Sequence, residues 1–235
     1  GSHVLHVPFL RPPVASCFCS CRCGCGHPID SHRAALPATR DIYGVRASRR
    51  YPIVVSITYP KDCDFWQTLM GTAPAVNILE EVSSTHGKGV RHSARSSNSE
   101  LPGVRLLVCI VPLMKGGTLL LVSRCPEGIG CHPLLVEYFG CSLDALLARL
   151  AAKELKDRNA GGQAVLLNRL KQKFKVALIS DGINNEDCSQ MGIEKYDTVD
   201  DAVASELRLL QARGRDWKDQ VAFLHESSVA IPYIE

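Results

Sequence analysis

Short runs of aliphatic and β-branched residues alternate with longer amphipathic stretches over residues 51–235. Four of the runs are too short for helices and predict buried strands, at 53–57, 117–123, 176–180 and 221–224. The longer stretches predict helices over 64–70 and 163–174, and two more helices that begin at the capping residues Ser142 and Thr198. Strands that alternate with helices indicate an α/β fold, with a mainly parallel or mixed sheet flanked by helices.

The loops that follow three of these strands are the candidate binding region. Ligands of open α/β sheets bind outside the carboxyl ends of the strands, which here lead into loops at 58–62, 124–130 and 181–185. Gly128-Ile129-Gly130 lacks the third glycine of a dinucleotide fingerprint, and the chain has no Walker loop, H-E-x-x-H or G-x-S-x-G motif. The sequence therefore places a candidate site at these loops and gives little support to NAD binding.

Residues 1–50 differ from the rest in composition and are expected to be irregular. They hold seven Arg, two Asp and no Lys or Glu, and Gly1-Ser2-His3 has the form of an expression-tag remnant. Five cysteines alternate with other residues here, namely Cys17, Cys19, Cys21, Cys23 and Cys25. Thiolates at this density bind soft metals such as Zn or Cu(I), which is one hypothesis for the segment. The other is a flexible stretch with exposed thiols, because the second C-x₂₋₄-C pair of a structural zinc site is missing.

The segment 77–110 interrupts the order of strands and helices. It is rich in Ser and basic residues, and loops beyond about 15 residues are uncommon in compact domains. Its apolar end, 106–111, is interpreted either as an extra strand or as the far edge of the segment. We therefore divide the chain into residues 1–50 and an α/β domain over 51–235, with an insertion at 77–110.

Composition and charge exclude several classes of protein. With 46% hydrophobic and 22% charged residues, the chain as a whole is typical of globular proteins rather than disordered ones. No apolar run approaches the roughly 18 residues that a membrane span needs, and a net charge of +3 is too small to indicate nucleic-acid binding. We expect a cytoplasmic protein, although the Arg-rich, acid-poor front end agrees in part with an organellar transit peptide.

Five motifs follow one another along the domain. They are V-V-S-I-T-Y-P-K-D at 54–62 with Gln67 behind it, the stretch from K-G-G to G-I-G at 115–130, V-A-L-I-S-D at 176–181, D-D-A at 200–202, and 221–232. Together they resemble the C-terminal domain of the nickel-dependent lactate racemase (LarA-like) family. The resemblance spans residues 51–234 without the segment 77–110.

This resemblance implies racemisation or epimerisation of a 2-hydroxy acid with a nickel-pincer nucleotide, and substrate binding by Gln67, Lys61 and Tyr59. The sequence departs from the family pattern in three places. Residues 1–50 leave no room for the family's N-terminal domain, which anchors the cofactor and supplies the catalytic histidines. Met70 stands where the family has a lysine that engages the substrate carboxylate, and the turn at 161–164 lacks the Trp or His-Lys of relatives.

We therefore expect a racemase-like C-terminal domain with a degenerate site, without full catalytic machinery and with its catalytic residues unknown. Its expected partners are a separate LarA-like N-terminal domain or a small 2-hydroxy acid, and neither nucleic acid nor membrane. The nickel-pincer nucleotide is not expected to bind this chain alone. Two alternatives stay open: an active 2-hydroxy-acid racemase or epimerase (an isomerase) with a missing or separate N-terminal domain, and a Cys-rich metal-binding protein.

Overall fold

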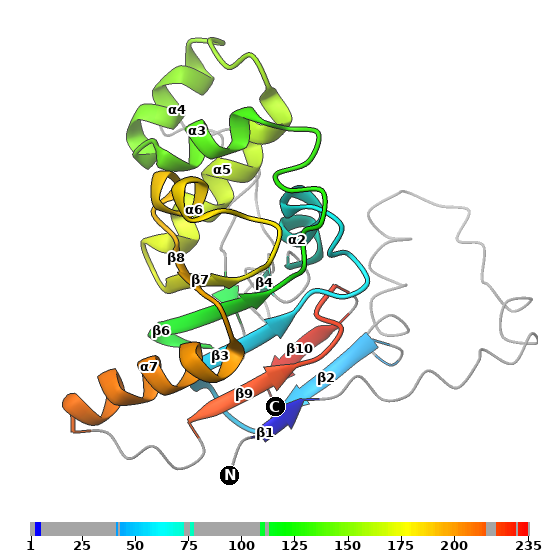
Figure 1. Ribbon diagram of the computed structural model, residues 1–235, viewed down its shortest axis with the longest axis vertical. Helices are drawn as coiled ribbons and strands as arrows, with labels where there is room; N and C mark the ends of the chain where they lie inside the picture. Colours follow the sequence, from blue (N-terminus) through cyan, green and yellow to red (C-terminus); the bar gives the residue numbers. More distant parts are fainter. Residues whose placement is uncertain are drawn as a thin grey trace, which may run out of the picture.

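A parallel sheet of six strands forms the centre of the computed structural model, which describes residues 3–5, 41, 43–72, 76–77, 109–110, 113–214, 220–228 and 230–234. The strands are hydrogen-bonded in the order β1-β9-β3-β6-β7-β8, and every neighbouring pair is parallel (Figure 1). In chain order they are β1 (His3–Leu5), β3 (Tyr51–Ile57), β6 (Leu113–Val122), β7 (Lys175–Ile179), β8 (Glu194–Tyr196) and β9 (Val221–Leu224). The α/β fold class predicted from the sequence is confirmed.

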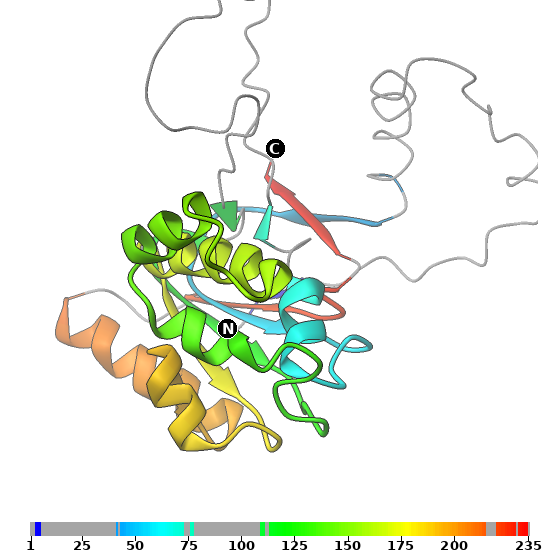
Figure 2. The same ribbon diagram turned by 90° about the horizontal axis from the view of Figure 1, so that it is seen from above.

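Helices cover both faces of this sheet. They are α2 (Phe65–Thr72), α3 (Leu134–Gly140), α4 (Leu143–Ala151), α5 (Arg158–Lys171), α6 (Asn185–Met191) and α7 (Val199–Ala212). Along β3 the side chains alternate between the faces: Ile53 and Val55 join the apolar cluster that includes α7 residues, whereas Val54 joins the larger cluster with α2, α3, α5 and α6. Seen from above, α7 and α2 lie on opposite sides of the molecule (Figure 2). Burial on both faces explains why the strands are apolar runs without alternation.

Two short ladders lie beside the main sheet. β2 (Gly44–Ala47) pairs in parallel with β10 (Ile231–Ile234), and β4 (Val76–Asn77) pairs antiparallel with β5 (Cys109–Ile110). The second ladder joins the two ends of the proposed insertion, whose residues 78–108 lie outside the described part of the chain. β1 and β2 belong to residues 1–50, and β1 begins at His3 of the supposed tag remnant. The proposed domain boundaries stay a prediction.

Helix capping follows the local sequence. Ser142 Oγ accepts a hydrogen bond from the Ala145 amide at the start of α4, and Thr198 Oγ1 accepts one from the Asp201 amide at the start of α7. Both predicted caps are therefore present.

The start predicted for the third helix is wrong. Residues 161–164 were interpreted as a turn, but α5 already begins at Arg158 behind an Asp157 cap. Gly161 lies inside α5 and packs closely against Leu155, since a Cβ at this position would come within 2.4 Å of Leu155 Cδ1. The glycine serves helix packing rather than a change of chain direction.

None of the described helices is long and apolar enough to cross a membrane.

Candidate functional site

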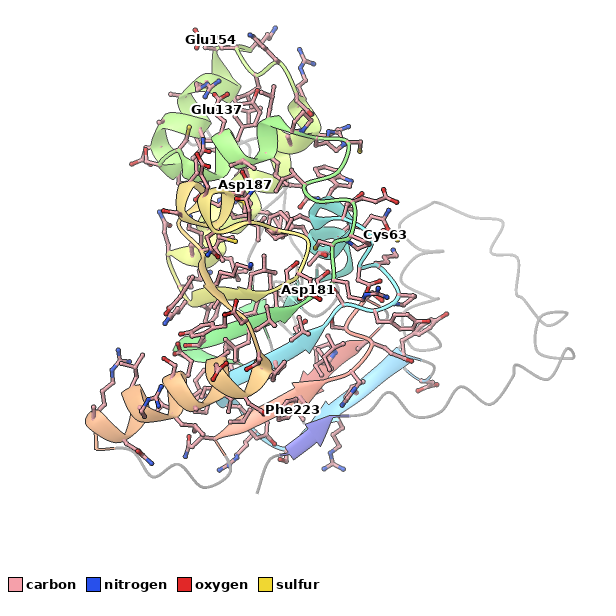
Figure 3. All side chains as sticks on the ribbon, in the orientation of Figure 1. Cys63, Glu137, Glu154, Asp181, Asp187 and Phe223 are labelled. Atoms are coloured by element: carbon pink, nitrogen blue, oxygen red, sulfur yellow. The ribbon has the colours of Figure 1, made fainter. Side chains whose placement is uncertain are left out.

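The three loops at the carboxyl ends of β3, β6 and β7 lie against one another. The Cys125 amide donates to the Asp62 carbonyl at 2.8 Å, which joins the first loop to the second. The Gly182 amide donates to the Arg124 carbonyl at 2.9 Å, which joins the second loop to the third. Figure 3 labels Cys63 and Asp181 on two of these connections. The region predicted from the sequence is therefore continuous in space.

Two glycines permit this close approach. A Cβ at Gly182 would lie 1.6 Å from the Cys125 carbonyl oxygen, so only glycine fits where the second and third loops meet. Gly130 has a φ of +89°, and a Cβ there would lie 2.6 Å from the Asp64 carboxyl carbon. The second and third loops thus pack backbone against backbone at Gly182, whereas Gly130 packs against the Asp64 side chain.

A buried cluster of hydroxyl and thiol groups fastens α2 to the second loop. Thr68 Oγ1 of α2 lies 2.5 Å from Ser123 Oγ and 3.3 Å from Cys125 Sγ, and all three residues are buried. The Cys125 thiol also donates to Ser123 Oγ at 3.2 Å. Cys125 is therefore a packing residue, as most buried cysteines are.

The three residues predicted to bind substrate lie on the connection from β3 into α2. Tyr59 is 60% exposed and Lys61 is exposed, whereas Gln67 is half-buried on the first turn of α2. Their side chains make no hydrogen bond or ion pair with other residues of the described part, so their polar atoms are open to a ligand. No hydrogen bond or ion pair joins these three side chains to one another within the described part of the chain. Their shared role as substrate ligands stays a prediction.

Met70 and Gln163, two of the positions that depart from the family pattern, contact each other. Gln163 Nε2 of α5 lies 2.8 Å from Met70 Sδ of α2, across 93 positions of sequence. Met70 is 41% exposed. An amide against a thioether therefore stands where the family resemblance places a lysine for the substrate carboxylate.

A histidine that sequence analysis left unassigned connects α2 with the start of α5. His132 precedes α3, its Nδ1 lies 2.6 Å from Asp157 Oδ2, and its ring centroid lies 3.9 Å from that of Trp66. The Ala160 amide, and after it His132, hold the pKa of Asp157 below its usual value. No local sequence signal links residues 132 and 157. The only sequence hint was the position of Asp157, which precedes an apolar-periodic stretch as capping residues do.

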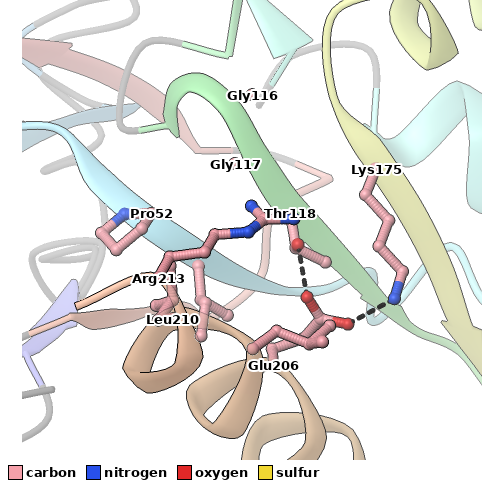
Figure 4. Close-up of a pocket in the computed structure, with 10 residues that line it drawn as sticks. Pro52, Gly116, Gly117, Thr118, Lys175, Glu206, Leu210 and Arg213 are labelled. Carbon is pink, nitrogen blue, oxygen red and sulfur yellow. Dashed lines mark hydrogen bonds and ion pairs between the residues drawn. The ribbon is translucent and has the colours of Figure 1, made fainter. Parts of the chain in front are cut away.

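A small cavity of about 70 Å³ lies at the opposite, amino-terminal edge of the sheet (Figure 4). Buried Glu206 accepts a hydrogen bond from Thr118 Oγ1 at 2.7 Å and pairs with Lys175 Nζ at 2.6 Å. Burial lowers the pKa of Lys175, but its contacts with Glu194 and Glu206 outweigh burial and raise it. These charged groups are all paired within the protein. Glu206 and Lys175 therefore serve as structural contacts, and Arg213 also lines the cavity.

Metal ligands do not gather in the described part of the chain, where no group of three or more His, Cys, Asp or Glu is placed to hold an ion. The described residues thus do not fit a nickel centre, and we derive no step through the nickel-pincer nucleotide. Cys17, Cys19, Cys21, Cys23 and Cys25 lie outside the described residues. The metal site hypothesised there stays a prediction.

Comparison with known proteins gives a likeness of fold. No model of a protein family and no curated protein matches the sequence. Among solved structures, the lactate racemase apoprotein from Thermoanaerobacterium thermosaccharolyticum matches with a TM-score of 0.57 and 16% identity, over 88% of this chain and 41% of that one. A Thermotoga maritima protein aligns with a TM-score of 0.49 and 12% identity, over 88% and 42% of the two chains. The chain thus shares the fold of part of the racemase and spans about two fifths of its length.

Proposed function

We propose that this chain is a LarA-like C-terminal domain that binds a small 2-hydroxy acid at the carboxyl edge of its sheet and does not racemise it alone. The fold likeness to a lactate racemase supports the class of ligand. The position of Gln67 carries the proposal most directly, because its half-buried amide has no partner in the described structure and lies beside the joined loops. An amide of this kind donates to a carboxylate or hydroxyl of a small acid.

Met70 explains why binding is expected to be weak. The family resemblance places a lysine there, and a charge-assisted hydrogen bond to a carboxylate contributes about 1.5–3 kcal/mol. Met70 supplies no charge and already contacts Gln163. Lys61 remains a cation on the same connection, and its exposed ammonium group is free to approach a bound carboxylate.

The proposal is tested by calorimetric titration of the full chain with D- and L-lactate. We expect saturable binding, and we expect Gln67→Leu to weaken it about three- to tenfold, the worth of one hydrogen bond. Gln211→Leu is the matched control, since this exposed glutamine lies on α7 across the sheet. Absence of saturable binding, or equal affinity in both variants and the wild type, would contradict the proposal.

A second candidate is a subunit that racemises lactate together with a separate LarA-like N-terminal domain. The observation that favours it is the 41% coverage of the racemase chain, which leaves the remainder of that enzyme without a counterpart here. Racemisation is measured for the chain alone and after addition of a cofactor-loaded racemase N-terminal domain. Turnover only in the mixture would favour this candidate, and turnover by the chain alone would contradict our primary proposal.

A further inference from the structure

One imidazole connects α2, the loop before α3 and the start of α5. His132 Nδ1 lies 2.6 Å from Asp157 Oδ2, and the His132 ring packs against Trp66 with 3.9 Å between ring centroids and 43° between the ring planes. The side chains of His132 and Asp157 are 18% and 22% exposed. The position of the ring is therefore restricted by the tilted Trp66 indole on one side and by a carboxylate at one nitrogen.

The carboxylate of Asp157 also decides which ring nitrogen carries hydrogen. Its Oδ1 accepts from the Ala160 amide at 3.0 Å, which leaves Oδ2 for His132. An ionised carboxylate only accepts hydrogen bonds, so Nδ1 of the neutral ring must be the donor. Nε2 then carries a lone pair, and it has no hydrogen-bond partner among the described residues. His132 Nε2 is therefore a hydrogen-bond acceptor whose orientation is fixed by Asp157.

The groups that hold this acceptor belong to the same two helices as residues of the proposed site. Trp66, against which the ring packs, precedes Gln67 in α2. Asp157 caps the helix whose Gln163 contacts Met70. α2 therefore carries both Gln67, the proposed donor to the carboxylate, and Trp66, which contacts His132. α5 is capped by Asp157, the hydrogen-bond partner of His132.

We propose that His132 Nε2 accepts a hydrogen bond from the 2-hydroxyl group of the bound acid, with Asp157 as its positioning residue. The inference rests on the proposed function, since it names the group that selects a 2-hydroxy acid over a simple carboxylic acid. Gln67 donates a hydrogen bond to the carboxylate, and His132 accepts one from the hydroxyl group. No bond to carbon forms or breaks, and the proton stays on the hydroxyl oxygen.

The test compares lactate with propionate, which differ only in the 2-hydroxyl group, by calorimetric titration of the full chain. We expect the wild type to prefer lactate by about three- to tenfold, the worth of one hydrogen bond. We expect His132→Ala to bring the ratio of lactate to propionate affinity close to one, whereas Gln67→Leu weakens the binding of both ligands. A purely structural role of His132 would not change the lactate-to-propionate ratio.

Asp157→Asn separates positioning from folding. Asparagine caps a helix about as well as aspartate, so α5 stays formed with the amide oxygen on Ala160. The amide nitrogen then faces Nδ1, which forces the ring hydrogen to Nε2 and removes the acceptor. We expect loss of the lactate preference in a variant that remains folded. Nitrogen-15 shifts of the His132 ring report the change of tautomer directly.

The outcomes distinguish the two proposals. A wild type that prefers lactate, together with a His132→Ala variant that keeps the same preference, overturns the role of His132 and leaves the proposed function intact. Equal affinity of the wild type for lactate and propionate also overturns the role of His132 alone. A wild type that binds neither acid overturns the proposed function and this inference with it.

Discussion

Gly182→Ala tests the close contact that joins the second and third loops. The new Cβ would lie 1.6 Å from the Cys125 carbonyl oxygen and 2.4 Å from its carbonyl carbon. Both atoms belong to backbone, so a rotamer change cannot relieve the overlap. An ordinary contact requires at least 3.4 Å, and the two loops must therefore move apart by roughly 2 Å.

The expected cost has two parts. Overpacking of a well-packed region costs about 1–3 kcal/mol. The Arg124 carbonyl accepts from the Gly182 amide at 2.9 Å and from Ser180 Oγ at 3.1 Å, and the movement weakens both hydrogen bonds at about 1 kcal/mol each. We expect Gly182→Ala to lower the free energy of unfolding by about 3–5 kcal/mol, a large share of a typical domain's stability.

Gly162→Ala is the matched control. Gly162 is exposed inside α5 and a Cβ there meets nothing within 4 Å, so alanine should raise stability by about 0.5–1 kcal/mol through the lower entropy of the unfolded chain. Urea unfolding followed by circular dichroism measures both variants. A Gly182→Ala protein within about 0.5 kcal/mol of the wild type would refute the reasoning, because the loops would then not be in the contact described.

Three further predictions follow from the other contacts. Glu206→Ala lowers the free energy of unfolding by about 2–4 kcal/mol in urea, because it leaves the Thr118 hydroxyl and one side of Lys175 without a partner; an unchanged midpoint would contradict the buried pair. Met70→Lys raises lactate affinity about tenfold or more in calorimetry, since it adds a charge-assisted bond, and unchanged affinity would remove Met70 from the site. The pKa values of Asp157 and Glu194 are lowered in the fold, so their stabilisation is present above their unfolded values of 3.8 and 4.5 and is lost as the pH falls through the folded values. Below these values, the free energy of unfolding should therefore depend less steeply on pH in Asp157→Asn and in Glu194→Gln than in the wild type. An unaltered pH profile in both variants would contradict these contacts.

Local sequence patterns were sufficient for the elements with long periodicity or a clear cap. The strands at 53–57 and 176–180 are apolar because both faces of the sheet are covered. Ser142 and Thr198 each sit one residue before a helix and accept the expected amide hydrogen bond. Such features are encoded within a few residues, and the α/β class follows from their alternation.

Short elements and long-range contacts left no comparable signal. α3 and β8 have seven and three residues, too few to establish a period. Gly161 was misinterpreted because its packing partner, Leu155, becomes visible only in three dimensions. The same holds for the candidate site: His132 and Asp157 are 25 positions apart, and no pattern within either segment names the other.

The central claim, that the carboxyl edge of the sheet binds a 2-hydroxy acid, is tested most directly by mapping amide NMR shifts of the full chain during titration with lactate. We predict saturable shifts in the β3–α2 connection at 58–70 and in the loop at 124–132. Residues around the opposite cavity, at 116–118 and 175, should not respond. Shifts confined to that opposite edge, or no saturable shift at all, would contradict the account.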